Sequence, residues 1–255
     1  MARTRAPFIT TVSLKRETVP SFREYPFCIP AIRHLRDLRL PGPVTFFLGE
    51  NGTGKSTLLE AVALASGFNA EGGSKHFRFS TRPSHSVLHE HLRLVRTVNR
   101  PRDGYFLRAE SFYNVVTAAE TEYGVLDAYG GRSLHEQSHG ESFMALVLQR
   151  LHGRGLYLFD EPEAALSPTR QLSLLAAMHA LVDQGSQFLI ATHSPILLGY
   201  PDATIYLFAE EGISRVAYDE TDHYIVTKSF LENPRRMLRE LLVDPTRADP
   251  PDGAA

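Results

Sequence analysis

One nine-residue run limits what this chain can fold into more than any other feature. It reads Gly49-Glu50-Asn51-Gly52-Thr53-Gly54-Lys55-Ser56-Thr57, which matches the pattern G-x-x-x-x-G-K-[ST]. An apolar stretch, residues 44–48, precedes the run, and residues 58–65 carry apolar side chains at helical spacing. A strand, a glycine-rich turn and a helix in this order point backbone N–H groups at one anion, and the helix N-terminus adds partial positive charge. The sequence therefore predicts a phosphate-binding loop.

All nine residues of this loop are candidate nucleotide-binding positions. Glycines allow the backbone to curl, so that successive N–H groups can surround a phosphate. Lys55 is expected to reach the β- and γ-phosphates, where its charge also makes it a candidate catalytic residue. The Ser56 hydroxyl is expected to ligate Mg²⁺.

A second apolar run, Leu156 to Phe159, is followed by two acidic residues, Asp160 and Glu161. An unbroken apolar run suits a central strand of a parallel sheet, and ligands bind at the carboxyl ends of such strands. We expect Asp160 to hold Mg²⁺ through its water shell and Glu161 to act as general base toward the attacking water. His193 follows another apolar run, residues 187–191, and is expected to contact the γ-phosphate.

A second predicted helix start offers a further anion site. Ser138 and Gly140 lie in the turn before a helix that should end near residue 153. The serine hydroxyl and the free N–H groups of that helix N-terminus can bind an anion. The same stretch completes the pattern His135-Glu136-x-x-His139, but a zinc protease needs both histidines within one helix. Because the turn residues place the helix start here, the protease interpretation is disfavoured.

The remaining elements are predicted from periodicity and turn residues. Strands are expected at residues 8–14, 27–32, 105–110, 205–208 and 214–218. Helices are expected at residues 84–96, 112–128, 168–184 and 227–242. The N-terminal strands should form a small sheet in front of the phosphate loop. In that region Tyr25 and Phe27 are either core aromatics or platforms on which a base stacks.

The composition favours an ordinary globular protein, with 43% apolar and 22% charged residues. No apolar run approaches the ~20 residues of a membrane span. The single cysteine, Cys28, excludes an internal disulfide framework and favours a reducing cytoplasm. A single domain is expected over residues 1–243, with a small helical lobe at about 112–152 and a disordered tail at 244–255.

The charges are distributed unevenly along the chain. Residues 1–108 hold 17 Lys and Arg against 8 Asp and Glu, whereas residues 109–255 hold 10 against 21. Such asymmetry can mark a face that binds a polyanion such as DNA. Basic residues around a nucleotide site, together with an acidic second half, would give the same balance without nucleic acid, so both interpretations stay open.

The motifs together resemble those of the ATP-binding-cassette (ABC) ATPases, in particular the soluble branch shared with SMC-, RecF- and double-strand-break-repair-type ATPases, often described as AAA-family ATPases. The resemblance covers roughly residues 8–242. By this likeness, residues 49–57 are the Walker A loop and residues 156–161 the Walker B strand. Residues 138–141 correspond to the signature turn, and residues 165–167 to the D-loop. His193 corresponds to the switch histidine.

The resemblance implies an α/β fold: a P-loop NTPase with a mostly parallel central sheet, an N-terminal antiparallel β subdomain and a small helical lobe. It also implies ATP and Mg²⁺ as cofactors, ATP hydrolysis, and an ATP-dependent head-to-tail homodimer. In that dimer Ser138 and Gly140 of one subunit cap the γ-phosphate held by the other subunit's Walker A loop.

The expected partner is a macromolecule, DNA or a protein, on which the dimer acts as a clamp or switch. The alternative is the ATP-binding subunit of a membrane transporter, and a third interpretation is a regulatory nucleotide-binding module with negligible turnover.

Three positions depart from the family pattern. His139-Gly140 stands where two glycines are usual, and Ser167 stands where the D-loop usually has an acid. Arg108 or Glu110 stands at the lid strand in place of a glutamine. These departures concern the coupling of hydrolysis to partner motion more than ATP binding.

Overall fold

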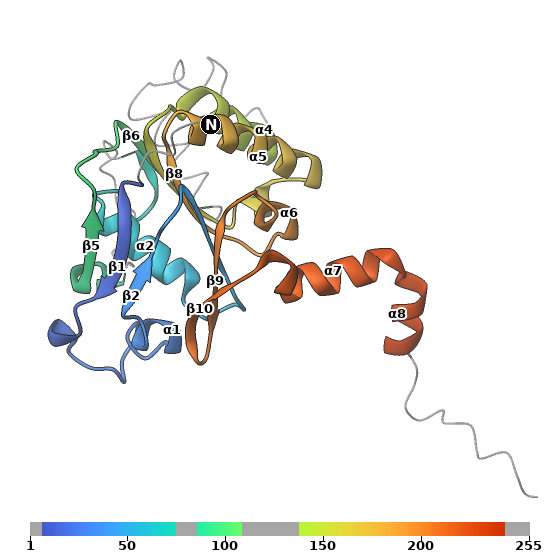
Figure 1. Ribbon diagram of the computed structural model, residues 1–255, viewed down its shortest axis with the longest axis horizontal. Helices are drawn as coiled ribbons and strands as arrows, with labels where there is room; N and C mark the ends of the chain where they lie inside the picture. The colour runs from blue at the N-terminus through green and yellow to red at the C-terminus, as the bar shows by residue number, and fades with distance from the viewer. Residues whose placement is uncertain (1–6, 75–85, 109–137, 243–255) are drawn as a thin grey trace, which may run out of the picture. The chain divides into compact units, whose positions relative to one another are not determined.

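The computed structural model describes residues 7–74, 86–108 and 138–242 of the 255 in the chain (Figure 1). Contacts between residues divide the chain after Val216 into two units, which are described separately below. The helix expected at 112–128, most of the expected helical lobe and the expected tail at 244–255 lie outside the described residues.

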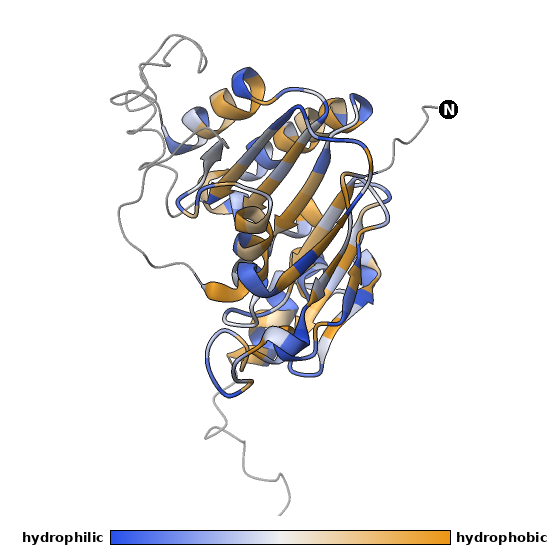
Figure 2. Cartoon of the chain, turned by 90° about the vertical axis from the view of Figure 1, so that its left-hand side faces the viewer, coloured by the Kyte–Doolittle hydropathy of each residue, from blue (hydrophilic) through white to orange (hydrophobic). Residues whose placement is uncertain are grey.

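A seven-stranded, mostly parallel sheet forms the centre of the first unit, in the order β10-β9-β3-β8-β7-β6-β4. Its strands are β3 (Val44–Leu48), β4 (Gly73–Ser74), β6 (Asp103–Arg108), β7 (Gly155–Asp160), β8 (Gln187–Ala191), β9 (Thr204–Ala209) and β10 (Gly212–Val216). Every residue of β3, β7 and β8 is buried, and strongly hydrophobic colouring marks the central strands in Figure 2. The parallel pairs run from β9 through β3, β8 and β7 to β6, and the two edge strands are antiparallel. The expected α/β fold with a mostly parallel sheet is confirmed.

A smaller antiparallel sheet is present, as expected, but only two of its three strands precede the phosphate loop in the sequence. It consists of β1 (Ile9–Leu14), β2 (Asp37–Arg39) and β5 (Leu92–Arg96), in the order β2-β1-β5. Helix α2 (Lys55–Ala65) contacts both β5 and the central strands β7 and β8. Its buried side chain Leu58 shares one apolar cluster with Val12 of β1 and Phe47 of β3. One continuous core therefore joins the small sheet to the strand that carries the phosphate loop.

The strand predicted at residues 27–32 is wrong. A short helix, α1 (Pro30–Arg33), occupies this stretch, and the second strand of the small sheet is β2. Pro30 takes the first helical position, where a missing N–H is tolerated, and the preceding residue, Ile29, is extended as expected before a proline. Local proline chemistry therefore determines this segment more than its apolar content does.

The helix predicted at residues 84–96 is also wrong. A 3₁₀ turn at Val87–His91 leads into β5, which pairs with β1. Leu92 and Leu94 pack inward while Arg93 is exposed, which is the alternation of a half-buried strand. Pairing with β1 therefore overrides the helical interpretation of this basic, histidine-rich stretch.

In the sequence, the other helices of the first unit connect strands of the central sheet. They are α4 (His139–Ala145), which continues into a π-helical turn at Leu146–Arg150, α5 (Pro168–Asp183) and α6 (Pro195–Leu198). Helix α5 begins as the sequence predicts: the Ser167 hydroxyl accepts the Arg170 N–H, and Pro168 is the first helical residue. Its buried side chains include Leu174 and Met178.

The second unit contains two helices, α7 (Asp222–Glu232) and α8 (Pro234–Leu241), where one helix was predicted at 227–242. The Thr221 hydroxyl caps α7 by accepting the Tyr224 N–H, which starts this helix earlier than expected. Asn233 and Pro234 separate the two helices, and the Asn233 side chain accepts the Arg236 N–H at 3.1 Å. The proline explains the break, because it cannot donate to the preceding turn.

Gln187, the first residue of β8, joins the two sheets of the first unit. Its side-chain oxygen accepts the N–H groups of Phe8 and Ile9 at 2.9 and 3.0 Å. Its side-chain nitrogen donates to the Ile9 carbonyl at 2.8 Å. Gln187 is only 1% exposed, so no water can replace these bonds without rearrangement.

Replacing Gln187 with alanine is expected to lower the free energy of unfolding by about 2 kcal/mol or more, because it leaves three buried backbone groups without partners. Urea unfolding followed by circular dichroism measures the change. The control is Gln149→Ala, since Gln149 is exposed and the same truncation should cost less than about 0.5 kcal/mol. Equal midpoints for the two variants would show that Gln187 does not join the sheets.

Candidate functional site

The phosphate loop follows β3 and leads directly into α2, as the sequence predicts. Gly49 and Gly54 have positive φ angles of 145° and 98°, which favour glycine. A Cβ atom on Gly49 would also lie 2.3 Å from the Phe208 carbonyl oxygen, so no other residue fits there. Both glycines are therefore required by the geometry of the turn.

The Lys55 side chain bonds to the backbone of the phosphate loop. Its ammonium group donates to the Gly49 carbonyl at 2.6 Å and to the Glu50 carbonyl at 2.9 Å, and the residue is only 4% exposed. Burial lowers the pKa of Lys55, while the nearby carboxylates of Glu161 and Asp160 act in the opposite direction. A phosphate at this loop would give the buried ammonium the counter-charge that stabilises it.

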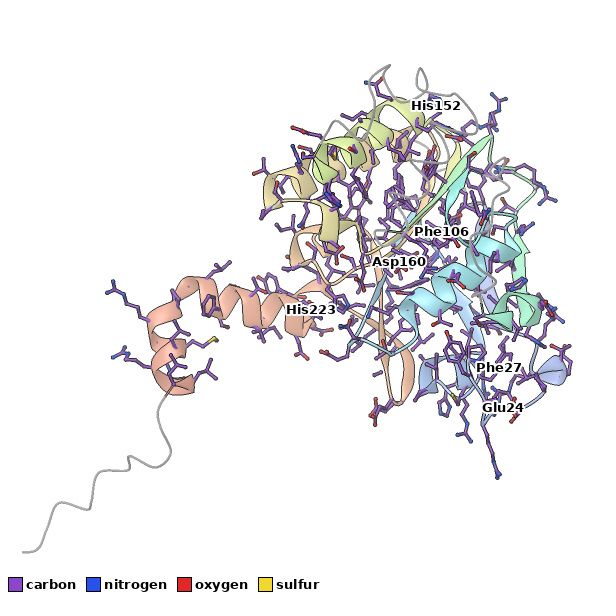
Figure 3. The ribbon with its side chains drawn as sticks, turned by 180° about the vertical axis from the view of Figure 1, so that it is seen from behind. Glu24, Phe27, Phe106, His152, Asp160 and His223 are labelled. Carbon is purple, nitrogen blue, oxygen red and sulfur yellow. The ribbon has the colours of Figure 1, made fainter. Side chains whose placement is uncertain are left out.

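Asp160 contacts the phosphate loop through Ser56. The Ser56 hydroxyl donates to Asp160 Oδ1 at 2.8 Å, although 104 residues separate the two in sequence. Asp160 is the last residue of β7, while His152, before the start of β7, lies at the other end of that strand (Figure 3). Hydroxyl and carboxylate oxygens are ligands that Mg²⁺ prefers, so Ser56 and Asp160 fit this ion. Among the described residues, no group of three or more His, Cys, Asp or Glu forms an all-protein metal site.

Glu161 and His193 face each other beside this pair. His193 Nε2 lies 3.7 Å from Glu161 Oε1, and the side chains are 28% and 43% exposed. Glu161 adopts a left-handed backbone conformation, with φ 51° and ψ 53°, and its N–H donates to the Ala191 carbonyl at 2.9 Å. Such a conformation is strained in a non-glycine residue and is concentrated at functional sites. The two residues expected at the γ-phosphate are therefore brought together.

Glu163 holds the turn that carries His193, a contact that the sequence analysis missed. Its Oε1 accepts the His193 N–H at 2.5 Å, and its carboxylate also bonds the Thr192 side chain. Burial raises the pKa of Glu163, with these hydrogen bonds opposing the shift. The only sequence signal is the second acid of Asp160-Glu161-Pro162-Glu163, which does not reveal its partner.

Arg108, the last residue of β6, links Asp160 to Glu60 of α2. Its Nη1 lies 2.5 Å from Glu60 Oε2, and its Nε lies 3.8 Å from Asp160 Oδ2. Arg108 is directly opposite Asp160 in the parallel register of β6 and β7. Arg108 is one of the two residues expected at the lid strand, and the other, Glu110, lies outside the described residues.

The signature turn forms a separate cluster at the start of α4. Glu141 accepts the Ser138 N–H and hydroxyl at 3.0 and 2.8 Å, which makes a capping box. Arg170 of α5 contacts both residues, at 3.3 Å from Ser138 Oγ and 3.2 Å from Glu141 Oε1. Ser138 is exposed, whereas Gly140 is buried and a Cβ there would lie 2.9 Å from the Ala165 carbonyl oxygen. Ser138 is therefore held by residues of α4 and α5.

The two aromatic residues upstream of the loop, Tyr25 and Phe27, differ in solvent exposure. Phe27 is 1% exposed and packs edge-on against the His91 ring, with the centroids 5.0 Å apart. Tyr25 is 65% exposed. Phe27 is thus a core aromatic, and only Tyr25 is available to stack on a base.

Family models match both halves of this site. The model "AAA domain" matches residues 21–102, which include the Walker A loop. The model "AAA domain, putative AbiEii toxin, Type IV TA system" matches residues 126–199, which include the Walker B strand and the switch histidine. The two AAA-domain models together match more than half of the chain, which is therefore an AAA-domain protein.

Similar proteins include components of ABC transporters and an SMC head domain. The chain is 26% identical over 172 residues to "Nucleoside import ATP-binding protein NupA" of Lactococcus lactis subsp. cremoris, which covers 60% of this chain and 33% of that protein. It is similar to the structure of cbiO1 from Clostridium perfringens, part of the ABC transporter complex cbiONQ (18% identity, 81% of this chain and 91% of that chain, TM-score 0.46). It is also similar to the SMC head domain from Thermotoga maritima (14% identity, 71% and 92%, TM-score 0.40).

The chain spans a third or less of the length of the curated relatives it matches. None of the described helices combines the length and the apolar character needed to cross a bilayer.

Proposed function

We propose that this AAA ATPase binds ATP with Mg²⁺, hydrolyses it, and acts on a macromolecule as an ATP-gated head-to-tail dimer in the cytoplasm. The observation that carries the proposal is the convergence of Lys55, Ser56, Asp160, Glu161 and His193 at one edge of the central sheet. Each of these residues has the chemistry that phosphoryl transfer to water requires.

The Lys55 ammonium, which donates to two loop carbonyls, can turn toward the β- and γ-phosphate oxygens, because its partners are neutral. Ser56 Oγ and Asp160 Oδ1 would hold Mg²⁺, which when bound neutralises phosphate charge. The Glu161 carboxylate accepts the proton of the attacking water as general base. His193, 3.7 Å from that carboxylate, orients it and contacts the γ-phosphate.

The dimer is supported by the signature turn. Ser138 is exposed at the N-terminus of α4, and Glu141 and Arg170 fix its position. A hydroxyl and free N–H groups held in this way can cap a phosphate carried by a second subunit. Ser138 and the N–H of Gly140 would then complete the site of the partner subunit.

The second candidate function is that of a transporter's ATP-binding subunit. It is favoured by the likeness to a protein named as a nucleoside import ATP-binding protein. The hydrolytic residues would be the same in both functions. Co-purification with a polytopic membrane protein would favour the transporter function over the clamp.

Phosphate release from ATP tests the proposal directly. We expect Mg²⁺-dependent turnover that falls at least about 100-fold in excess EDTA, because Ser56 and Asp160 hold the phosphate-neutralising ion. Lys55→Ala should weaken ATP binding by about 30-fold or more, since it removes the buried cation of the loop. Lys228→Ala, on an exposed face of α7, is the matched control and should leave both quantities unchanged. Turnover that survives both EDTA and Lys55→Ala would contradict the proposal.

A further inference from the structure

A basic hollow lies on the outer side of the small β2-β1-β5 sheet, away from the hydrolytic residues in sequence. Its volume is about 640 Å³. Its lining includes Ser13, Arg16, Arg33, Arg36, Asp37 and Arg93. They come from β1 and the turn after it, from α1 and the segment after it, and from β2 and β5.

Strand register explains why three of these side chains share one face. Ser13 of β1 is directly opposite Asp37 of β2 on one side and Arg93 of β5 on the other. Directly paired residues project to the same face of a sheet. The Ser13 hydroxyl donates to Asp37 Oδ1 at 2.7 Å, so the one carboxylate of the hollow is already partnered.

The four arginines outnumber the carboxylates around them, which are Asp37 in the lining and Glu17 beside Arg93. The guanidinium groups of Arg33 and Arg36 have no hydrogen-bond or ion-pair partner among residues 7–74, 86–108 and 138–242. Arg93 lies 3.8 Å from Glu17, but both side chains are about two-thirds exposed, so this pair is weak.

Arg16 is held in place at the rim of the hollow. Its Nη1 donates to the Arg33 carbonyl at 2.6 Å, and its guanidinium lies 4.4 Å from the centroid of the Phe22 ring. These contacts reduce the entropy that Arg16 would lose on binding a ligand, because the side chain is already ordered. The hollow is therefore partly organised for an anion.

We propose that this hollow binds the phosphodiester backbone of a nucleic acid. Guanidinium groups match phosphate oxygens in charge and in their forked geometry. Four arginines around one open hollow suit a chain of phosphates better than a single small anion. The lining includes no Phe, Tyr or Trp on which a base could stack, so binding is to the backbone and independent of sequence.

The hollow is distinct from the phosphate loop, and α1 lies between them. A Cβ on Gly54 of the loop would be 2.9 Å from Ile29 and 3.5 Å from Ile32, whereas Arg33 of the same short helix lines the hollow. This inference rests on the proposed function only in naming the macromolecule on which the ATPase acts. Backbone binding itself requires no nucleotide.

The test measures binding of a 30-base-pair duplex DNA of arbitrary sequence by fluorescence anisotropy, without nucleotide, between 50 and 200 mM salt. The wild-type protein should bind, with an affinity that falls steeply with salt. Arg33→Glu/Arg36→Glu should lower the affinity at least about 30-fold and reduce the salt slope by about two, because two phosphate contacts are lost. Both residues are exposed and unpartnered, so the fold should tolerate the change.

Arg100→Glu/Arg102→Glu is the matched control, since it changes the net charge equally on exposed arginines outside the hollow. It should lower the affinity by less than about threefold. Affinity for a fluorescent ATP analogue should be the same in all three proteins, which separates this site from the phosphate loop.

Absent binding at 50 mM salt, or equal losses in the two double variants, would overturn the inference. Displacement of DNA by polyglutamate at equal charge concentration would also overturn the inference. It would show that the hollow binds an acidic polypeptide as well as it binds a nucleic acid. A duplex RNA of the same length distinguishes the two nucleic acids, and binding of either supports the backbone assignment. If ATP turnover is absent but DNA binding follows the expected pattern, the proposed function fails and this inference stands.

Discussion

Glu161→Gln is expected to lower the rate of ATP hydrolysis by at least about 100-fold while leaving ATP affinity within about threefold of wild type. Glutamine has nearly the same shape as glutamate but cannot accept the proton of the attacking water. The phosphate loop and the Ser56–Asp160 pair are untouched by the change. The variant should therefore bind ATP and fail only in the chemical step.

The same variant should accumulate as an ATP-bound dimer. In the proposed head-to-tail arrangement ATP joins the two subunits, and hydrolysis releases them. Size-exclusion chromatography with light scattering, in saturating ATP and Mg²⁺, measures the dimer fraction. Glu211→Gln, at the exposed turn between β9 and β10, is the control and should behave as the wild type.

Two results would contradict this role of Glu161. Turnover within about tenfold of wild type would mean that another group accepts the proton, since loss of a general base costs about 100-fold or more. Glu163 would then be the next candidate, because its carboxylate lies against the backbone of the His193 turn. A variant that stays monomeric in saturating ATP would contradict the ATP-gated dimer.

The Walker residues could be predicted from the sequence because their geometry is locally determined. Glycines with positive φ at Gly49 and Gly54 can hardly be replaced. The apolar runs before Gly49 and Asp160 are short and bounded by turn residues, which favours buried strands. Parallel strands place their carboxyl ends at one edge, so the approach of Asp160 to Ser56 followed from topology. These parts of the site depend on short-range chemistry and on one general rule of α/β sheets.

The parts that the sequence did not predict depend on long-range pairing. Residues 92–96 form a strand because β1 is available beside them, and nothing within the segment itself excludes a helix. Gln187 bonds to Phe8 and Ile9, 179 and 178 residues away, which no periodicity can indicate. The contact of Glu163 with the His193 turn likewise joins two loops that meet only in the folded chain.

Arg108 is expected to stabilise the fold while opposing metal binding, and these two effects can be measured separately. Arg108→Ala should lower the free energy of unfolding by about 3 kcal/mol, because it leaves the Glu60 carboxylate, 12% exposed, without its cation. Glu60→Gln/Arg108→Ala should recover at least about 1 kcal/mol of this loss, since the unpaired charge is gone. Urea unfolding of the four proteins of this double-mutant cycle gives the coupling energy.

The control for Arg108 is an arginine pair of the same kind at the surface. Arg236 lies 3.0 Å from Glu240, with both side chains about 70% exposed, so Arg236→Ala should cost less than about 0.5 kcal/mol. A loss for Arg108→Ala as small as that of Arg236→Ala would show that the Glu60–Arg108 pair does not stabilise the fold.

The effect of Arg108 on metal binding should have the opposite sign. Its Nε lies 3.8 Å from Asp160 Oδ2, so the guanidinium competes with any cation for that carboxylate. Arg108→Gln, which removes this positive charge, should lower the Mg²⁺ concentration for half-maximal ATP binding by about fivefold. If Arg108 only stabilised the fold, the Arg108→Gln variant would show an unchanged or higher half-maximal Mg²⁺ concentration. The guanidinium of Arg108 would thus raise the Mg²⁺ concentration that nucleotide binding requires.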